Sequence, residues 1–224
     1  MAGAVVALVG SGCAAPNLSR TVGRGNSELH ASAGGPFAAV LGPPLPVPHA
    51  NVGGRVGVSN RVDLDGNVNL LAMAFQILAF DVAANVQLYR RRGGLAVAGS
   101  TRLYLMGDLD EPPATRLYPE LGLHAGGPVP RVDWLHLYGG QTLVVSPNPP
   151  RDGSAVFWTP FFGVEFLLPY QRARRGRTRQ HGIAIHTAWM NPHEQRNTVL
   201  DYQPSRGAIA VHLGYRLRFG GLDR

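Results

Sequence analysis

The sequence predicts an all-β protein, an antiparallel up-and-down β-barrel that crosses a membrane with about ten strands. Apolar and polar residues alternate over segments of about twelve residues, roughly twice the usual length of a soluble strand. Segments of this length suit tilted strands that cross a bilayer. Charged residues make up only 16% of the 224 residues, whereas an ordinary soluble domain has about 25%. We therefore expect part of the surface to face something other than water.

The alternation is clearest in the last predicted strand, 206–219. One parity is uniformly apolar and the other is small, polar or basic, which indicates a sheet with one face in an apolar environment. The apolar set is Ile209, Val211, Leu213, Tyr215, Leu217 and Phe219, and the opposite set is Ala208, Ala210, His212, Gly214, Arg216 and Arg218.

The same reasoning places nine further strands before this one. Short and longer connectors alternate along the chain, as expected of a meander whose turns lie at one end and whose loops lie at the other. The connector 71–78 contains no turn residues and is the least certain boundary, so eight or twelve strands also fit the pattern. The ten predicted strands are 28–40, 50–59, 61–70, 79–90, 94–106, 115–126, 132–146, 154–168, 180–190 and 206–219.

The polarity of the two faces distinguishes a membrane barrel from a soluble one. A lipocalin-like barrel has an apolar interior and a polar exterior, and a membrane barrel has the reverse arrangement. Here the face opposite the apolar one is rich in Gly, Ala, Asn and Ser, and the chain contains no lysine to solvate an exterior. This composition favours a polar lumen. A soluble, lipocalin-like binding barrel remains the alternative.

The last strand contains the string HLGYRLRF. It resembles the terminal assembly signal of bacterial outer-membrane β-barrel proteins, which has a polar residue, a glycine, a hydrophobic residue and an aromatic residue at fixed spacing. The matching positions are His212, Gly214, Leu217 and Phe219. The resemblance implies location in the outer membrane of a Gram-negative bacterium, with outer-membrane lipids and the barrel-assembly machinery as partners. The family usually ends on the aromatic residue, whereas this chain continues with a tail at 220–224.

The N-terminus contains the single cysteine of the chain, so no internal disulfide can form. Cys13 follows an apolar stretch and three small residues, a pattern that resembles a bacterial lipoprotein signal peptide. The resemblance implies that 1–12 is a signal-like segment, that Cys13 is lipidated, and that 13–27 is a tether to the barrel at 28–219. An apolar N-terminus with an incidental cysteine is the alternative.

The chain has 21 basic residues, all of them arginine, against 14 acidic residues, for a net charge of +7. The densest run lies at 169–180, but no aromatic residue is interleaved between its arginines, as would be expected of a nucleic-acid-binding arm. We therefore predict no nucleic-acid partner. The run is interpreted as a solvated turn or as one whose arginines touch lipid phosphates. Its arginines are Arg172, Arg174, Arg175, Arg177 and Arg179.

The polar parity of the strands predicts a lumen that contains both signs of charge. In a narrow barrel such side chains can form a cross-linked plug, which predicts a structural or surface protein; a porin-like path for small solutes is the second interpretation. If the first and last strands pair, Glu28 should lie close to Arg216 or Arg218. The predicted lumen residues are Glu28, Arg55, Asp63, Asp65, Asp81, Arg102, Glu120, Glu165, His186, His212, Arg216 and Arg218.

One group of lumen residues could carry chemistry. Symmetrical hairpins would place His186 opposite His212 and Glu165 diagonally beside His186. The three side chains could then act as general acid and base in an outer-membrane hydrolase, or bind a metal ion. No motif set of a known barrel enzyme is present, and we predict that the protein is not an enzyme and has no metal or cofactor.

Aromatic residues fall mostly toward the ends of the predicted strands. This placement is typical of the interfacial girdles of a membrane barrel, where a ring contacts both lipid and water. Ordinary core packing is the alternative. The residues are Trp134, Tyr138, Trp158, Tyr170, Trp189 and Tyr215.

Overall fold

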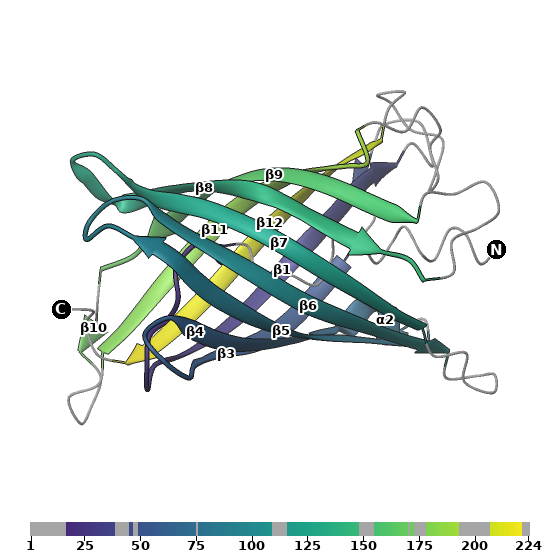
Figure 1. Ribbon diagram of the computed structural model, residues 1–224, viewed down its shortest axis with the longest axis horizontal. Helices are drawn as coiled ribbons and strands as arrows, with labels where there is room; N and C mark the ends of the chain where they lie inside the picture. Colours follow the sequence, from purple (N-terminus) through teal and green to yellow (C-terminus); the bar gives the residue numbers. More distant parts are fainter. Residues whose placement is uncertain are drawn as a thin grey trace.

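The computed structural model describes residues 17–38, 45–46, 49–74, 76–108, 116–147, 155–169, 171–172, 178–192 and 207–220. Within these ranges ten long antiparallel strands close into a barrel (Figure 1). They are β1 (Ser27–Ala38), β3 (His49–Gly57), β4 (Val62–Asn69), β5 (Ile77–Arg90), β6 (Ala96–Asp108), β7 (Arg116–Val129), β8 (Val132–Val145), β9 (Val156–Leu167), β11 (Thr178–Met190) and β12 (Ala208–Gly220).

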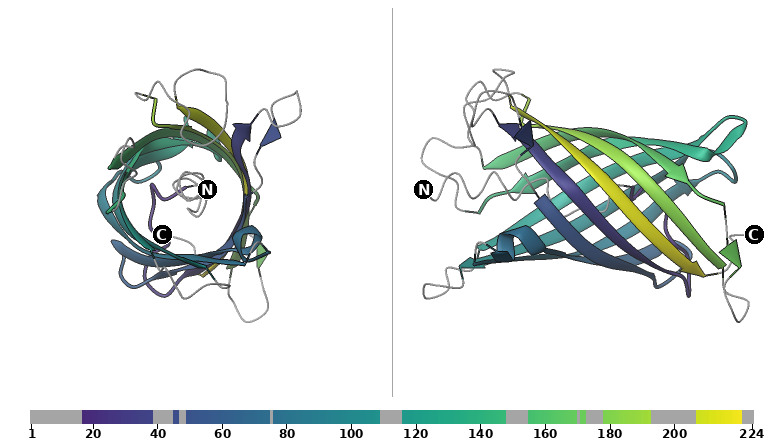
Figure 2. Two further views of the ribbon diagram at one scale, coloured as in Figure 1. Left: turned by 90° about the vertical axis from the view of Figure 1, so that its right-hand side faces the viewer. Right: turned by 180° about the vertical axis from the view of Figure 1, so that it is seen from behind.

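The barrel closes where the first strand meets the last. β1 pairs with β12 in a continuous register from Ser27 opposite Phe219 to Pro36 opposite Ala210. Every other long strand pairs with its neighbours along the chain, and β9 pairs directly with β11. The view along the barrel in Figure 2 shows the closed ring. The predicted fold class and the predicted count of ten strands are therefore confirmed.

Three short elements were absent from the predicted set. β2 (Leu45–Pro46) and β10 (Gln171–Arg172) are two-residue extensions that pair with β1 and β11. The connector without turn residues contains a short helix, α2 (Leu70–Ala74). The side chain of Asn69 caps this helix, because its Oδ1 accepts a hydrogen bond from the backbone N–H of Ala72 at 2.9 Å.

The outer surface of the barrel is apolar and its inner surface is polar, the reverse of a soluble protein. Large apolar side chains point outward on every long strand with described side chains, and Leu121 is 63% exposed. The lumen side is polar, and Arg102 is only 2% exposed. An apolar outer surface of this extent requires an apolar surrounding, and a closed barrel leaves no unpaired strand edge within it. The arrangement is that of a membrane barrel and opposite to that of a lipocalin-like barrel.

Aromatic side chains mark the ends of the outer surface. Trp158 and Trp189 are exposed at the end where longer connectors join the strands, and Trp134 is exposed near the opposite end. Tyr215 is also exposed. Tyr138 corrects the prediction, because it points into the lumen and is 3% exposed. Tyr170 lies outside the described residues.

Tyr138 has the inward parity of β8, and its neighbour across the sheet leaves room for the ring. It lies opposite Gly163 on β9, and a Cβ at Gly163 would overlap the Tyr138 ring.

In the described part of the chain, no helix has the length and apolar character needed to cross a membrane.

The two ends of the barrel differ in their connectors. Short turns at 58–61, 91–95 and 130–131 join strands at one end, hereafter the turn end. β1 begins and β12 ends at this same end. Residues 17–26, hereafter the lumen segment, lie within the ring near the turn end (purple in Figure 2). The interior is therefore occupied by a piece of chain as well as by side chains.

Candidate functional site

The candidate site is the lumen, into which the strands direct nearly all the charged residues that the alternation predicted. Glu28, Arg55, Asp63, Asp65, Asp81, Arg102, Glu120, Glu165 and His212 are buried, and His186, Arg216 and Arg218 are partly buried. Most of these side chains belong to two adjoining groups of ion pairs.

The first group is centred on Arg102 of β6. Its Nη2 lies 2.7 Å from Asp65 Oδ1, its Nη1 pairs with Asp81, and its Nε lies 3.8 Å from Glu120 Oε1. The register explains the convergence, because Arg102 lies opposite Glu120 on β7 and opposite Ala83 on β5, next to the strand that carries Asp65. Alternation along each strand turns all of these side chains to the same side.

Two polar residues that the sequence analysis did not single out complete this group. The Tyr104 hydroxyl donates to Glu120 Oε2 at 2.9 Å, and the Asn67 side-chain amide donates to Asp65 Oδ1 at 3.0 Å and to Asp81 Oδ1 at 2.9 Å. The carboxylates are therefore held by neutral donors as well as by one guanidinium group. Buried charges require this kind of pairing and hydrogen bonding.

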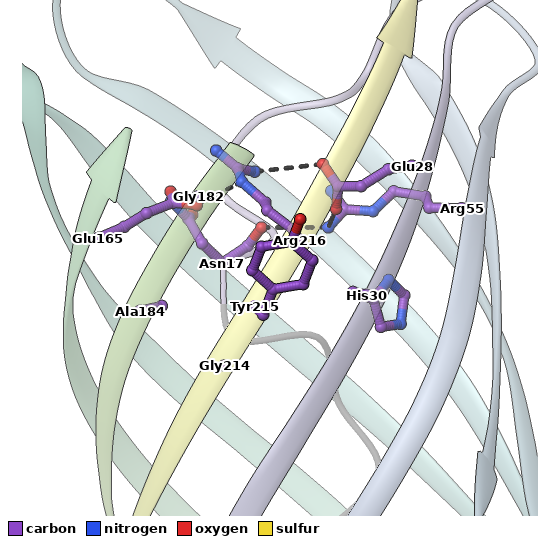
Figure 3. Close-up of a pocket in the computed structure, with 10 residues that line it drawn as sticks. All are labelled: Asn17, Glu28, His30, Arg55, Glu165, Gly182, Ala184, Gly214, Tyr215 and Arg216. Atoms are coloured by element: carbon purple, nitrogen blue, oxygen red, sulfur yellow. Dashed lines mark hydrogen bonds and ion pairs between the residues drawn. The ribbon is translucent and has the colours of Figure 1, made fainter. Parts of the chain in front are cut away.

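The second group crosses the seam between β1 and β12 (Figure 3). Arg55 Nη2 lies 2.8 Å from Glu28 Oε1, and Arg216 Nη1 lies 3.3 Å from Glu28 Oε2. This contact confirms the expected proximity of Glu28 to Arg216 where the barrel closes. Arg216 also pairs through Nε with Glu165 on β9.

The two groups join at Asp65. Its Oδ2 lies 3.9 Å from Arg55 Nε, while its Oδ1 contacts Arg102. The ion pairs therefore extend across the lumen-facing wall from β9, past the seam, to β7. Such a network fills the lumen with fixed charges of both signs and stiffens the wall on both sides of the closure.

The lumen segment is attached to this network by hydrogen bonds. The Asn17 side-chain amide donates to Glu165 Oε2 at 2.6 Å, and the backbone N–H of Val22 donates to Asp63 Oδ2 at 2.8 Å. Arg55 Nη2 donates to the Asn17 carbonyl at 3.3 Å, and Arg218 Nη2 donates to the Thr21 carbonyl at 3.2 Å. Four lumen residues on four strands thus hold one short segment.

Gln87 of β5 adds a further attachment. Its Oε1 accepts from the Thr21 N–H at 3.1 Å, and its Nε2 donates to the Ser19 carbonyl at 3.1 Å. Leu18 and Val22 are also buried within the ring. The sequence predicts a tether at 13–27 but does not predict that 17–26 lies inside the lumen. No periodic signal in that stretch indicates where it lies.

The proposed catalytic group is only partly assembled. His186 lies opposite His212 as the hairpin symmetry predicted, with ring centroids 6.0 Å apart. Glu165 lies opposite Ala184, but its two oxygens pair with Asn17 and Arg216. The carboxylate is therefore engaged away from the imidazoles.

The histidines have neighbours that the sequence analysis missed. The ring of His49 on β3 lies 6.4 Å from that of His212, and Tyr138 stacks on His186 at 5.9 Å. Gly34 on β1 separates His49 from His212 in the ladder, so the two rings face each other across a position without a side chain. Among the described residues no group of three or more His, Cys, Asp or Glu is arranged to hold a metal ion.

The assembly-signal residues occupy both faces of β12. His212 and Gly214 are buried on the lumen side, and Phe219 lies opposite Ser27 at the start of β1. The Arg179 guanidinium group lies 5.7 Å from the centroid of the Phe219 ring. Leu217 is partly exposed. Cys13 and the central arginines of the run, Arg174, Arg175 and Arg177, lie outside the described residues.

Comparison with known proteins gives structural neighbours only. No family model matches the chain, and no curated protein matches it. One solved structure, described as a bacterial polysaccharide outer membrane secretin, is 10% identical with a TM-score of 0.39, over 88% of this chain and 98% of that one.

Two further structures match over similar lengths of this chain. The translocator domain of the autotransporter NalP from Neisseria meningitidis is 8% identical with a TM-score of 0.38, over 88% of both chains. A Pseudomonas aeruginosa FadL homologue is 10% identical with a TM-score of 0.33, over 87% of this chain and 61% of that one.

Proposed function

We propose that the protein is a bacterial outer-membrane β-barrel whose lumen is closed by its own residues and which has a structural or surface role. One observation carries the proposal: the apolar outer face surrounds a lumen filled by ion pairs and by residues 17–26. Side chains that are paired with one another across the interior leave little room for a solute path.

Assignment to the outer membrane rests on the barrel and on the last strand. A closed antiparallel barrel satisfies all its backbone groups within lipid, and exposed tryptophans mark both ends of the apolar face. The assembly-signal resemblance at His212, Gly214, Leu217 and Phe219 supports insertion by the barrel-assembly machinery. Outer-membrane lipids are then the principal partners.

Membrane fractionation tests the location. We expect the full chain to sediment with the outer membrane and to migrate differently on a gel before and after boiling, because a closed barrel resists detergent until it is heated. Recovery in the soluble fraction, with migration unchanged by boiling, would overturn the proposal. A soluble periplasmic protein expressed in the same cells provides the fractionation control.

Planar-bilayer recording tests whether the lumen is closed. We expect the purified full chain to insert without a stable open conductance. A steady ohmic conductance from the unmodified chain would contradict the closed lumen. The same sample is tested for heat modifiability, which shows that the barrel is folded. The absence of conductance then indicates a closed lumen and not a failure to fold.

A narrow pore for small solutes is the second candidate, favoured by the way the lumen segment is held. Residues 17–22 contact the wall through hydrogen bonds to Asp63, Gln87, Glu165 and Arg218 and form no strand pairing. Deletion of 17–22 should open a conductance if this segment is a removable plug. If the deletion variant remains folded and also shows no conductance, only the structural role remains.

Acylation of Cys13 is a separate part of the proposal. The cysteine follows small residues after an apolar stretch, and its lipid would anchor the chain to the membrane beside the barrel. Mass spectrometry of the protein from a Gram-negative host with an adequate upstream signal should show loss of 1–12 and a diacyl or triacyl modification. An intact N-terminus with an unmodified thiol would contradict it.

A further inference from the structure

The turn end of the barrel opens into a vestibule of about 990 Å³, in whose lining arginine is the most frequent residue. The lumen segment forms part of its inner wall, and the turns at 58–61 and 91–95 form part of its rim. A space of this size accommodates a ligand larger than a single inorganic ion. Three of the lining arginines, Arg24, Arg61 and Arg92, have exposed side chains.

The lining is strongly unbalanced in charge. Arg216 is ion-paired with Glu28 and Glu165. Among the described residues that line the vestibule, Asp133 is the one carboxylate. Like charges gathered against the low-dielectric wall of a barrel focus a positive potential on the space between them.

Hydrogen bonds between the rim and the lumen segment fix the arginines relative to one another. Asn60 Oδ1 accepts from the backbone N–H of Arg24 at 3.3 Å, and the Asn60 carbonyl accepts from the Thr21 hydroxyl at 3.1 Å. The Arg61 carbonyl accepts from the backbone N–H of Gln87 at 2.7 Å. The backbones that carry Arg24 and Arg61 are therefore held together before any ligand arrives, which reduces the entropic cost of binding.

We propose that this vestibule binds multivalent phosphate-bearing anions. The planar guanidinium fork matches two phosphate oxygens at once, and several such forks around one space favour a ligand with more than one negative charge. The phosphate can belong to a soluble anion or to a lipid headgroup at the membrane surface. The binding site stands whether the lumen beyond it is closed or forms a pore.

Calorimetric titration with inorganic pyrophosphate tests the site. The full chain, folded in a zwitterionic detergent, should bind pyrophosphate saturably, and the affinity should fall as salt is added. The test variant is R61Q with R92Q, and the matched control is R91Q with R131Q, since all four side chains are exposed and the control pair does not line the vestibule. Both variants lose the same net charge.

We expect the test variant to bind about tenfold or more weakly and the control to change less than about twofold. Absence of saturable binding to the unmodified chain, or equal losses in both variants, would overturn the proposal. Heat modifiability of each variant confirms that the barrel remains folded. A folded barrel in the membrane fraction that fails to bind would refute the vestibule and leave the proposed function standing.

The phosphate source is distinguished in nanodiscs. If lipid headgroups occupy the vestibule, phosphatidylglycerol in place of phosphatidylcholine should weaken pyrophosphate binding by competition in the unmodified chain. An equal affinity in both discs assigns the site to a soluble anion. Either result supports the phosphate site, and the absence of binding in both discs contradicts it.

Discussion

Replacement of Arg102 by methionine should strongly destabilise the barrel. Arg102 is 2% exposed, lies 2.7 Å from Asp65, pairs with Asp81, and lies 3.8 Å from Glu120. Methionine keeps much of the side-chain volume and removes the guanidinium group at the centre of this cluster, so three buried carboxylates lose their common partner. Removal of one partner from a buried ion pair costs about 3–5 kcal/mol, and we expect the free energy of unfolding to fall by that amount.

The measurement is urea unfolding of the folded barrel in lipid vesicles, followed by tryptophan fluorescence. The control is Arg92→Met, an exposed arginine on a turn, which should change the unfolding free energy by no more than about 0.5 kcal/mol. The double variant R102M with D81N removes one of the unpaired charges and should recover at least about 1 kcal/mol relative to R102M alone. A loss below about 1 kcal/mol for R102M, or no recovery in the double variant, would refute the ion-pair network as a source of stability.

Three further predictions concern the outer face, the seam and the lumen segment. Leu121→Arg, at a position 63% exposed on the outer face, should destabilise a lipid-embedded barrel by up to about 2–4 kcal/mol in the same assay; no effect would indicate that this face is in water. Phe219→Ala should reduce the folded fraction in the outer membrane more than His212→Ala, because it removes the aromatic residue of the assembly signal, and equal yields would contradict that role. Gln87→Ala removes both of its hydrogen bonds to the lumen segment and should accelerate hydrogen exchange at the Thr21 amide, whereas unchanged exchange would show that other contacts hold the segment.

The sequence by itself determined the barrel, its strands and the direction of most side chains. Alternation is a local property, because successive residues of a strand point to opposite faces whatever the strand pairs with. The predicted strand 206–219 therefore corresponds closely to β12 (Ala208–Gly220). The connector between β11 and β12 is long, and His186 was placed opposite His212 by assuming a hairpin that is symmetrical about residue 199, which the observed register confirms.

Only the tertiary structure decided which side chains meet inside the barrel. Glu165 and Asn17 are 148 positions apart in the chain and share a hydrogen bond, and no periodic pattern relates them. Glu165 also pairs with Arg216 in preference to the nearby imidazoles, because the opposite charge lies within reach once β9, β11 and β12 are adjacent. Strand parity turns Tyr138 inward, and strand pairing places Gly163 opposite it, which leaves space for the ring. Strand parity is local, whereas the occupant of a closed lumen depends on residues brought together from the whole circumference.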